Sequence, residues 1–178
     1  DVWNNQPHID FQIGTDVLCF NDPTTQTFVV FDHGFFYDVE QLPMPKYRSG
    51  RGFIVYEDLS GNLWYYQNGE QFQLSNFSAD FWDVKDDIVV WSESSYFFTY
   101  CNGEKNQIEN FTPVQFKIKN DVLAYQNILG GVNAFVKGEK FELTNQLDSQ
   151  FEIYGDRVLV KMFNNSFMVL ENGKKYTN

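Results

Sequence analysis

A glycine that recurs at nearly constant intervals constrains the fold of this chain more than any other feature of the sequence. Gly34, Gly69, Gly103, Gly138 and Gly173 are spaced by 35, 34, 35 and 35 residues. Three of them follow asparagine, in "YQNGEQ", "YCNGEK" and "LENGKK", and Asn-Gly is a favoured two-residue hairpin turn. Internal repeats with periods of about 20–50 residues are typical of solenoids, propellers and arrays.

The residues that follow each glycine alternate between apolar and polar types. Thirteen positions after each glycine, counting also from a virtual one before residue 1, stands an aromatic residue: Phe11, Tyr47, Trp82, Phe116 and Phe151. The next position is always polar, and the one after it is aliphatic in four of the five repeats. Side chains with a period of two indicate a β-strand.

Three further strands complete the predicted repeat. The nearly continuous apolar runs "VLCF", "FIVY", "IVVW", "VLAY" and "RVLV" indicate a second strand that is buried on both faces. A third strand ends before each glycine, and a fourth follows it, as in "QFQL" and "KFEL". The unit is therefore four antiparallel strands in about 35 residues, and no helical period is found.

This repeat resembles the blades of β-propeller proteins over nearly the whole chain. The paired Gly-His and Trp-Asp signature of WD40 repeats and the sialidase-type Asp-box are absent from the sequence. The resemblance implies an all-β, five-bladed propeller of four-stranded antiparallel blades, or alternatively five blades of a larger propeller. The resemblance rests on the period of the repeat and implies no functional residues in this sequence.

The repeat also predicts how one propeller domain over residues 1–178 divides into blades. We expect the blades at approximately residues 8–40, 41–75, 76–109, 110–144 and 145–178. Residues 1–7 align with an outer strand and the crossover that follows it. They are predicted to supply or extend the outer strand of the last blade.

Composition limits the kinds of partner. The net charge of −11 disfavours nucleic acid and anionic lipid, which carry charge of the same sign. No apolar run approaches the roughly 18 residues of a membrane span. Cys19 and Cys101 fit no metal or redox spacing, and no cofactor is expected. The aromatic, Asn-rich composition and an N-terminal residue other than Met favour an extracytoplasmic location.

Catalytic signatures are equally scarce. There is no nucleophile motif, no Gly-rich phosphate loop and no His/Cys metal spacing, so a non-catalytic binding module is expected. Glycoside hydrolysis by a pair of carboxylates is the less favoured alternative.

Two candidate surfaces follow from the repeat. The polar residues after the strand-one aromatics are predicted to form a mixed-charge ring around the propeller axis, acting as an ion-pair network or a polar channel site: Gln12, Arg48, Asp83, Lys117 and Glu152. The crossovers between blades and the loops between strands two and three are predicted to share one face. Its candidate binding residues are Met44, Lys46, Arg48, Arg51, Asp58, Phe77, Phe81, Glu93 and Phe111.

Two functions remain open for that face. The first is binding of a protein partner within a larger assembly, and the second is lectin-like binding of a glycan. A lectin of this type predicts equivalent pockets, and hence repeated loop residues. The loops between strands two and three diverge, as "NDPTTQ", "EDLSG", "SESS", "NILGG" and "FNNS" show, which favours the protein partner.

Overall fold

The computed structural model describes residues 9–178 as twenty strands in five four-stranded antiparallel sheets. The first sheet contains β1 (Gln12–Ile13), β2 (Val17–Asn21), β3 (Phe28–Asp32) and β4 (Phe35–Glu40). The second contains β5 (Lys46–Ser49), β6 (Ile54–Glu57), β7 (Leu63–Gln67) and β8 (Glu70–Gln73). The third contains β9 (Phe81–Lys85), β10 (Ile88–Glu93), β11 (Tyr96–Cys101) and β12 (Glu104–Glu109). The fourth contains β13 (Phe116–Lys119), β14 (Val122–Gln126), β15 (Val132–Val136) and β16 (Glu139–Thr144). The fifth contains β17 (Gln150–Tyr154), β18 (Arg157–Lys161), β19 (Phe167–Glu171) and β20 (Lys174–Thr177).

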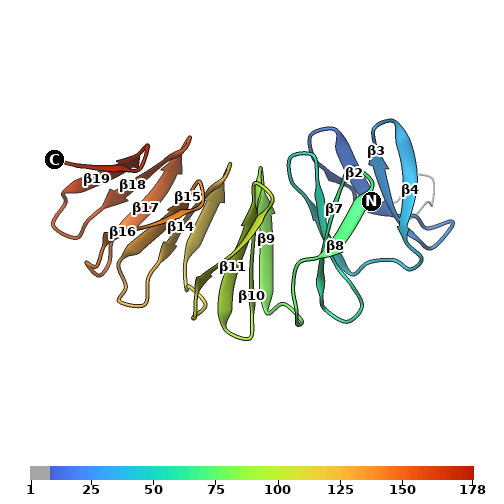
Figure 1. Cartoon of the computed structure of the whole chain (residues 1–178), viewed down its shortest axis with the longest axis horizontal. Helices are drawn as coiled ribbons and strands as arrows, with labels where there is room; N and C mark the ends of the chain where they lie inside the picture. The colour runs from blue at the N-terminus through green and yellow to red at the C-terminus, as the bar shows by residue number, and fades with distance from the viewer. Residues whose placement is uncertain (1–8) are drawn as a thin grey trace. The chain divides into compact units, whose positions relative to one another are not determined.

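The chain divides into two compact units (Figure 1). Unit 1 is Asp1–Ala79, which holds the first two sheets, and unit 2 is Asp80–Asn178, which holds the other three. Each sheet is a meander in which every strand pairs with its neighbour in sequence. Among the described residues no helix is long and apolar enough to cross a membrane.

The recurring glycine occupies the turn between the third and fourth strands of each sheet. At Asn68-Gly69 both residues have positive φ, 52° and 81°, and Asn102-Gly103 has 52° and 80°. Two positive φ values define a type I′ turn, whose twist matches that of the flanking strands. Because only glycine adopts this conformation without strain, the turn accounts for the spacing seen in the sequence.

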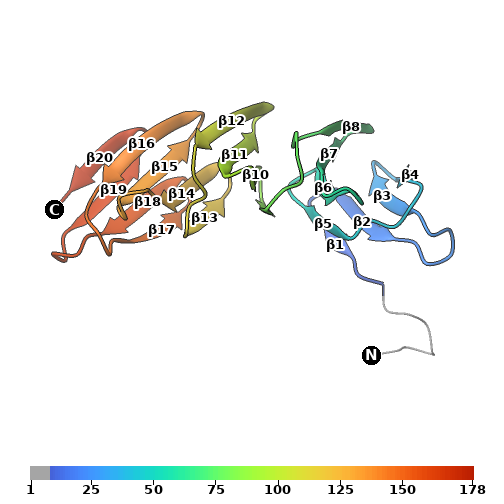
Figure 2. The ribbon, with the colours of Figure 1, turned by 90° about the horizontal axis from the view of Figure 1, so that it is seen from below.

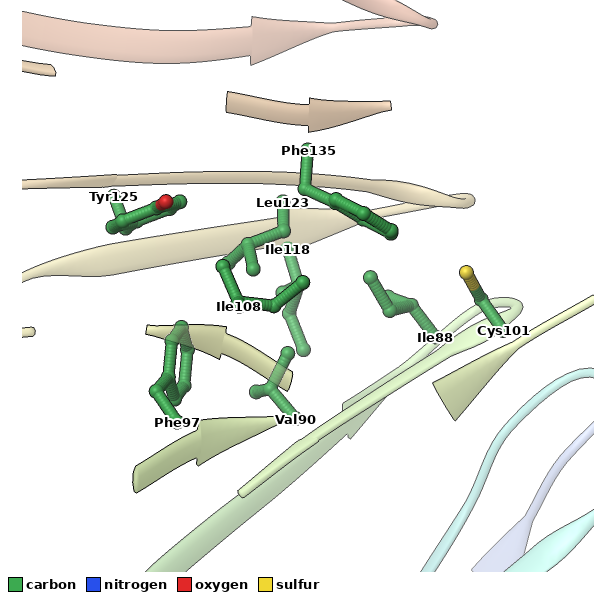
Figure 3. Packing of buried hydrophobic residues seen from close by; sticks show 9 residues of the cluster. All are labelled: Ile88, Val90, Phe97, Cys101, Ile108, Ile118, Leu123, Tyr125 and Phe135. Atoms are coloured by element: carbon green, nitrogen blue, oxygen red, sulfur yellow. The ribbon is translucent and has the colours of Figure 1, made fainter. Parts of the chain in front are cut away.

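The core of each unit lies between successive sheets rather than within one. Figure 3 shows this for the third and fourth sheets, where Ile88, Val90 and Phe97 meet Leu123 and Tyr125, all with no exposed surface. The faces of the first and second sheets, and of the fourth and fifth, pack in the same way. A sheet in the middle of this arrangement therefore buries both of its faces.

A buried tyrosine–glutamate hydrogen bond joins successive sheets in both units. The Tyr56 hydroxyl on the second sheet donates to Oε1 of Glu40 on the first at 2.6 Å. The Tyr125 hydroxyl on the fourth sheet donates to Oε1 of Glu109 on the third, also at 2.6 Å. Both tyrosines are fully buried. Burial, with the neighbouring carboxylate as a second cause, raises the pKa of each phenol above its usual value.

The structure confirms the predicted all-β class and the four-stranded antiparallel repeat. The fifth sheet is completed by β20, which pairs with β19 (Figure 2), so its outer strand is Lys174–Thr177. Residues 1–7, predicted to supply or extend that strand, lie outside the described residues.

The hydrogen bond between Tyr125 and Glu109 predicts a specific loss of stability. The substitution Tyr125→Phe removes a donor to a carboxylate that is only 12% exposed, and hydrogen bonds to charged groups contribute about 1.5–3 kcal/mol. We expect the free energy of unfolding, measured with urea, to fall by about 1.5 kcal/mol, because Lys140 still pairs with Glu109 at 2.6 Å. The control Tyr96→Phe alters an exposed tyrosine and should change it by less than about 0.5 kcal/mol. Equal effects of the two variants would contradict the role of this bond.

Candidate functional site

Strand direction gathers two kinds of connection at the same end of each sheet. Because the strands are antiparallel, the connection between strands two and three and the crossover to the next sheet both leave from one end. We call this the loop end. In unit 1 it comprises residues 22–27, 41–45, 58–62 and 74–79, and in unit 2 residues 94–95, 110–115, 127–131, 145–149 and 162–166.

The Pro-Met-Pro crossover is held against the core of unit 1. The side-chain amide of Asn21 donates to the carbonyl of Met44 and accepts from its N–H, both at 2.9 Å. Met44 itself is buried among Phe28, Ile54 and other residues of the first two sheets. Its side chain is therefore a core residue, which corrects the expectation of a surface contact.

The basic residues of the same segment do not gather at one end. Lys46 and Arg48 lie on β5, and Arg51 lies in the connection between β5 and β6, which is at the opposite end of the sheet from the crossover. This corrects the expectation that Lys46, Arg48 and Arg51 lie on the crossover face together with Met44. The physical reason is that β5 itself spans the sheet between the two ends.

The predicted aromatic and acidic residues also differ in their surroundings. Phe77 is 63% exposed at the loop end, and Phe111 is half-buried. Phe81 lies on β9 and packs on Phe97 and Phe116, with ring centroids 6.0 and 5.4 Å away, so it belongs with the core.

Glu93, predicted as an exposed loop acid, is instead a buried carboxylate. It is 2% exposed and accepts from the indole Nε1 of Trp91 at 3.3 Å. Lys105 Nζ lies 3.7 Å from Glu93 Oε1. The carboxylate therefore accepts the hydrogen bond of the buried Trp91 indole. This corrects the expectation that Glu93 is a binding residue on the crossover face.

Asp58 organises the loop between β6 and β7. Its Oδ1 accepts the N–H groups of Ser60 and Asn62 at 2.8 and 2.9 Å, and its Oδ2 accepts from Trp64 Nε1 at 3.0 Å. Burial alone would raise the pKa of this carboxyl, but the hydrogen bonds from Trp64, Asn62 and Ser60 outweigh burial and lower it. Asp58 is thus an ionised group that shapes a turn.

The polar residues that follow the strand-one aromatics are divided between the units. In unit 2, Lys117 forms an ion pair with Glu152, and its ammonium lies 5.7 Å from the centre of the Phe151 ring. Asp83, Lys117 and Glu152 line one shallow hollow on strands β9, β13 and β17. Gln12 and Arg48 lie on β1 and β5 of unit 1.

A set of exposed apolar side chains at the loop end of unit 2 was not anticipated from the sequence. Its members come from two crossovers and two loops and are between 61% and 87% exposed: Val114, Ile128, Leu129, Leu147 and Phe163. We call this set the apolar loop surface. The sequence signal was "NILGG", where two aliphatic residues stand in a loop beside two glycines.

Asn127 fixes the most apolar of these loops. Its Oδ1 accepts the N–H groups of Leu129 and Gly131 at 3.0 and 2.9 Å, and its Nδ2 donates to Asn145 Oδ1 in the next crossover at 2.9 Å. A Cβ on Gly130 would lie 2.4 Å from Leu147 Cδ2, so Leu147 packs directly on this loop. Ile128 and Leu129 are therefore presented on a hydrogen-bonded frame.

The fold and the position of these loops define the class of the protein. Sheets that are meanders of four strands and pack face to face, with loops and crossovers at one end, are the blades of a β-propeller. The sequence matches the family described as the 10-bladed beta propeller domain over residues 1–176, and the chain belongs to that family. The ten blades of the family fit the alternative in which these five blades belong to a larger propeller.

Solved structures resemble the chain in fold at low sequence identity. Human WBSCR16 has 8% identity and a TM-score of 0.52, with 97% of this chain and 67% of that chain covered. A structure of Kap60 bound to yeast RCC1 (Prp20) has 7% identity and a TM-score of 0.51, with 90% and 55% covered. Kluyveromyces lactis Hsv2 has 14% identity and a TM-score of 0.45, with 95% and 62% covered. The chain thus spans less than two thirds of several of the structures it resembles, such as the 62% of Hsv2. No curated protein matches its sequence.

The lowered pKa of Asp58 predicts a pH-dependent contribution to stability. A carboxyl whose pKa is lower in the folded state stabilises the protein above its unfolded pKa of about 3.9. That contribution is lost as the pH falls through the folded value. We expect Asp58→Asn, which places an amide beside the Trp64 indole N–H, to lower the urea midpoint at pH 7, and the difference from wild type to shrink below about pH 4. A difference that stays constant from pH 7 to pH 3 would contradict this assignment.

Proposed function

We propose that the protein is a non-catalytic β-propeller that binds a protein partner through the apolar loop surface of unit 2. The observation that carries the proposal is the exposure of Val114, Ile128, Leu129, Leu147 and Phe163 at one end of the unit. Apolar side chains that gather on a protein surface mark sites of interaction with other macromolecules. The net charge of −11 favours a partner with basic groups around its apolar contact.

The chemistry of the surface favours a protein over a glycan. Four of its five side chains are aliphatic, and branched aliphatic groups offer no flat ring on which a sugar can stack. An aliphatic group does fit the apolar centre of a protein interface, where water is excluded by the residues around it. The frame provided by Asn127 supports this use, because an ordered loop loses less conformational entropy on binding.

The state of the carboxylates supports a non-catalytic role. Glycoside hydrolysis needs one carboxyl with a raised pKa close to a second one. The pKa of Asp58 is lowered, and its carboxylate accepts hydrogen bonds from backbone N–H groups of its own loop. Glu93 and Glu109 are engaged by Trp91 and by Tyr125 and Lys140. One fold relative is a structure of two proteins, Kap60 and RCC1, bound to each other, so propeller folds are compatible with such a role.

The test compares a double variant at the loop end with a matched control at the opposite end. Ile128→Ser/Leu129→Ser removes two exposed aliphatic side chains, and Phe35→Ser removes an equally exposed residue from the turn end of the first blade, where it is 65% exposed. Immobilised wild type, double variant and control are incubated with an extract of the source organism, and retained proteins are quantified by mass spectrometry. We expect a partner kept by wild type and control to be reduced by about tenfold or more in the double variant.

Two outcomes would overturn the proposal. Equal retention of the partner by all three proteins would show that binding does not depend on Ile128 and Leu129 of the apolar loop surface. Specific binding on a glycan array, abolished in the double variant, would replace the protein partner with a sugar.

A further inference from the structure

Exposed apolar side chains in the described part of the chain are of two kinds. Phe20 on β2 is half-buried, and Leu159 on β18 is 37% exposed. At the same repeat positions Tyr125 and Ala124 are fully buried between blades, so the packing of blades accounts for an apolar residue there. The members of the apolar loop surface lie outside these positions, in crossovers and in loops of differing length. Their apolar character is therefore a property of the loop end itself.

The loop end of unit 2 is almost free of charged side chains. Its 23 residues in loops and crossovers include one, Asp148, although charged residues make up 21% of the chain. At the opposite end of the same unit, the two-residue turns contain 12 residues, of which five are charged: Asp86, Asp87, Asp121, Lys137 and Asp156. Charged residues are depleted at the centre of protein interfaces, because a charge that loses its hydration requires a partner. The loop end of unit 2 therefore has the composition of an interface centre.

Two carboxylates flank the part of this surface that Leu147 forms. Asp148 follows Leu147 in the crossover, and Glu142 on β16 accepts a hydrogen bond from the side-chain amide of Asn145 in the same crossover. Both carboxylates are exposed, and neither forms an ion pair with another residue in the range 9–178. The exposed base Lys161 ends β18 on the fifth blade, so the acidic edge lies toward the fourth blade. An apolar contact bordered by carboxylates without ion pairs favours a partner with basic groups beside its apolar residues.

The exposed apolar side chains recur across the successive blades of unit 2 (Figure 1). Val114 and Leu147 lie in the crossovers that enter the fourth and fifth blades, and Leu129 and Phe163 lie in the loops between the second and third strands of those blades. Because stacked sheets lie about 10 Å apart, equivalent loops on the two blades are separated by a similar distance. An α-helix returns to the same face after about seven residues, a rise of about 10.5 Å, whereas alternate residues of a strand are about 6.7 Å apart. The spacing between blades therefore matches two turns of a helix.

We propose that the apolar loop surface binds a basic amphipathic helix of the partner protein, which lies across the fourth and fifth blades. The inference rests on the proposed function and names the chemistry of the partner. Strands end at the loop end rather than run along it, so an extended segment finds no sheet edge to pair with, whereas a helix satisfies its own backbone hydrogen bonds. The apolar stripe of the helix contacts Leu129, Leu147 and Phe163. Lys or Arg residues beside the stripe face Glu142 and Asp148.

Selection from a displayed library of random peptides of about 18 residues, five turns of a helix, tests the period and the charge together. The library is selected on the immobilised 178-residue chain and depleted on Ile128→Ser/Leu129→Ser, which removes peptides attracted by net charge alone. We expect enriched sequences to carry apolar residues at intervals of about seven and an excess of Lys and Arg. The most enriched peptide is then synthesised with a fluorescent label. Its Kd should rise at least about tenfold in the double variant and stay unchanged in the control Phe35→Ser.

Charge variants separate the acidic edge from the net charge of the protein. Asp148→Lys should weaken binding of the synthesised peptide by about fivefold, whereas Asp156→Lys, which changes the net charge equally in a turn at the opposite end, should not. Equal effects of the two variants, or enriched peptides in which apolar and polar residues alternate as in a strand, would overturn the inference. The absence of enriched peptides that depend on Ile128 and Leu129 would overturn it too. If an extract still yields a partner that depends on these two residues, the proposed function stands without the helix.

Discussion

The packing of one blade face on the next is the interaction on which the rest of this structure depends. Leu123 and Ala124 are neighbours on β14 and point to opposite faces of the fourth sheet, yet both are fully buried, Leu123 against the third sheet and Ala124 against the fifth. A meander of four strands with two apolar faces cannot shield either face by itself. A blade therefore depends on a neighbouring blade to bury its apolar faces, and the energy of the fold is distributed over contacts between repeats.

The buried polar groups of the aromatic residues find their hydrogen-bond acceptors in different places from blade to blade. Tyr56 and Tyr125 each obtain a carboxylate from the preceding blade, whereas the Trp91 indole obtains Glu93 from its own strand. A buried donor without an acceptor costs about 1–3 kcal/mol, so every aromatic residue with a polar atom requires such a partner. The apolar packing is thus repetitive, while the hydrogen bonds that complete it are individual.

This difference explains how much the sequence could predict. The glycine spacing and the alternation after Phe11 and Tyr47 predicted five four-stranded sheets, because turn conformation and strand periodicity are local properties. The surroundings of Met44 and Glu93 are not local properties of the sequence. Met44, in the crossover, is held by Asn21 on β2, 23 residues away, and Glu93 accepts a hydrogen bond from the buried Trp91 indole. A spacing of 16 residues between glutamate and tyrosine occurs in both bonded pairs, and it was the available signal for the contacts between blades. The apolar loop surface could not be predicted in this way, because its residues stand in loops that do not follow the repeat, and the sequence pattern of such loops does not indicate which side chains are exposed.

Position within the repeat separates the two exposed apolar surfaces of the molecule. Phe20 and Leu159 occupy positions that are buried in other blades, so their apolar character is already required by the packing of the fold. Ile128 and Leu129 stand in loops whose sequences differ from blade to blade, and no packing of blades requires them to be apolar. Exposure at a repeat position therefore points to assembly with another blade, whereas exposure away from the repeat points to a different partner.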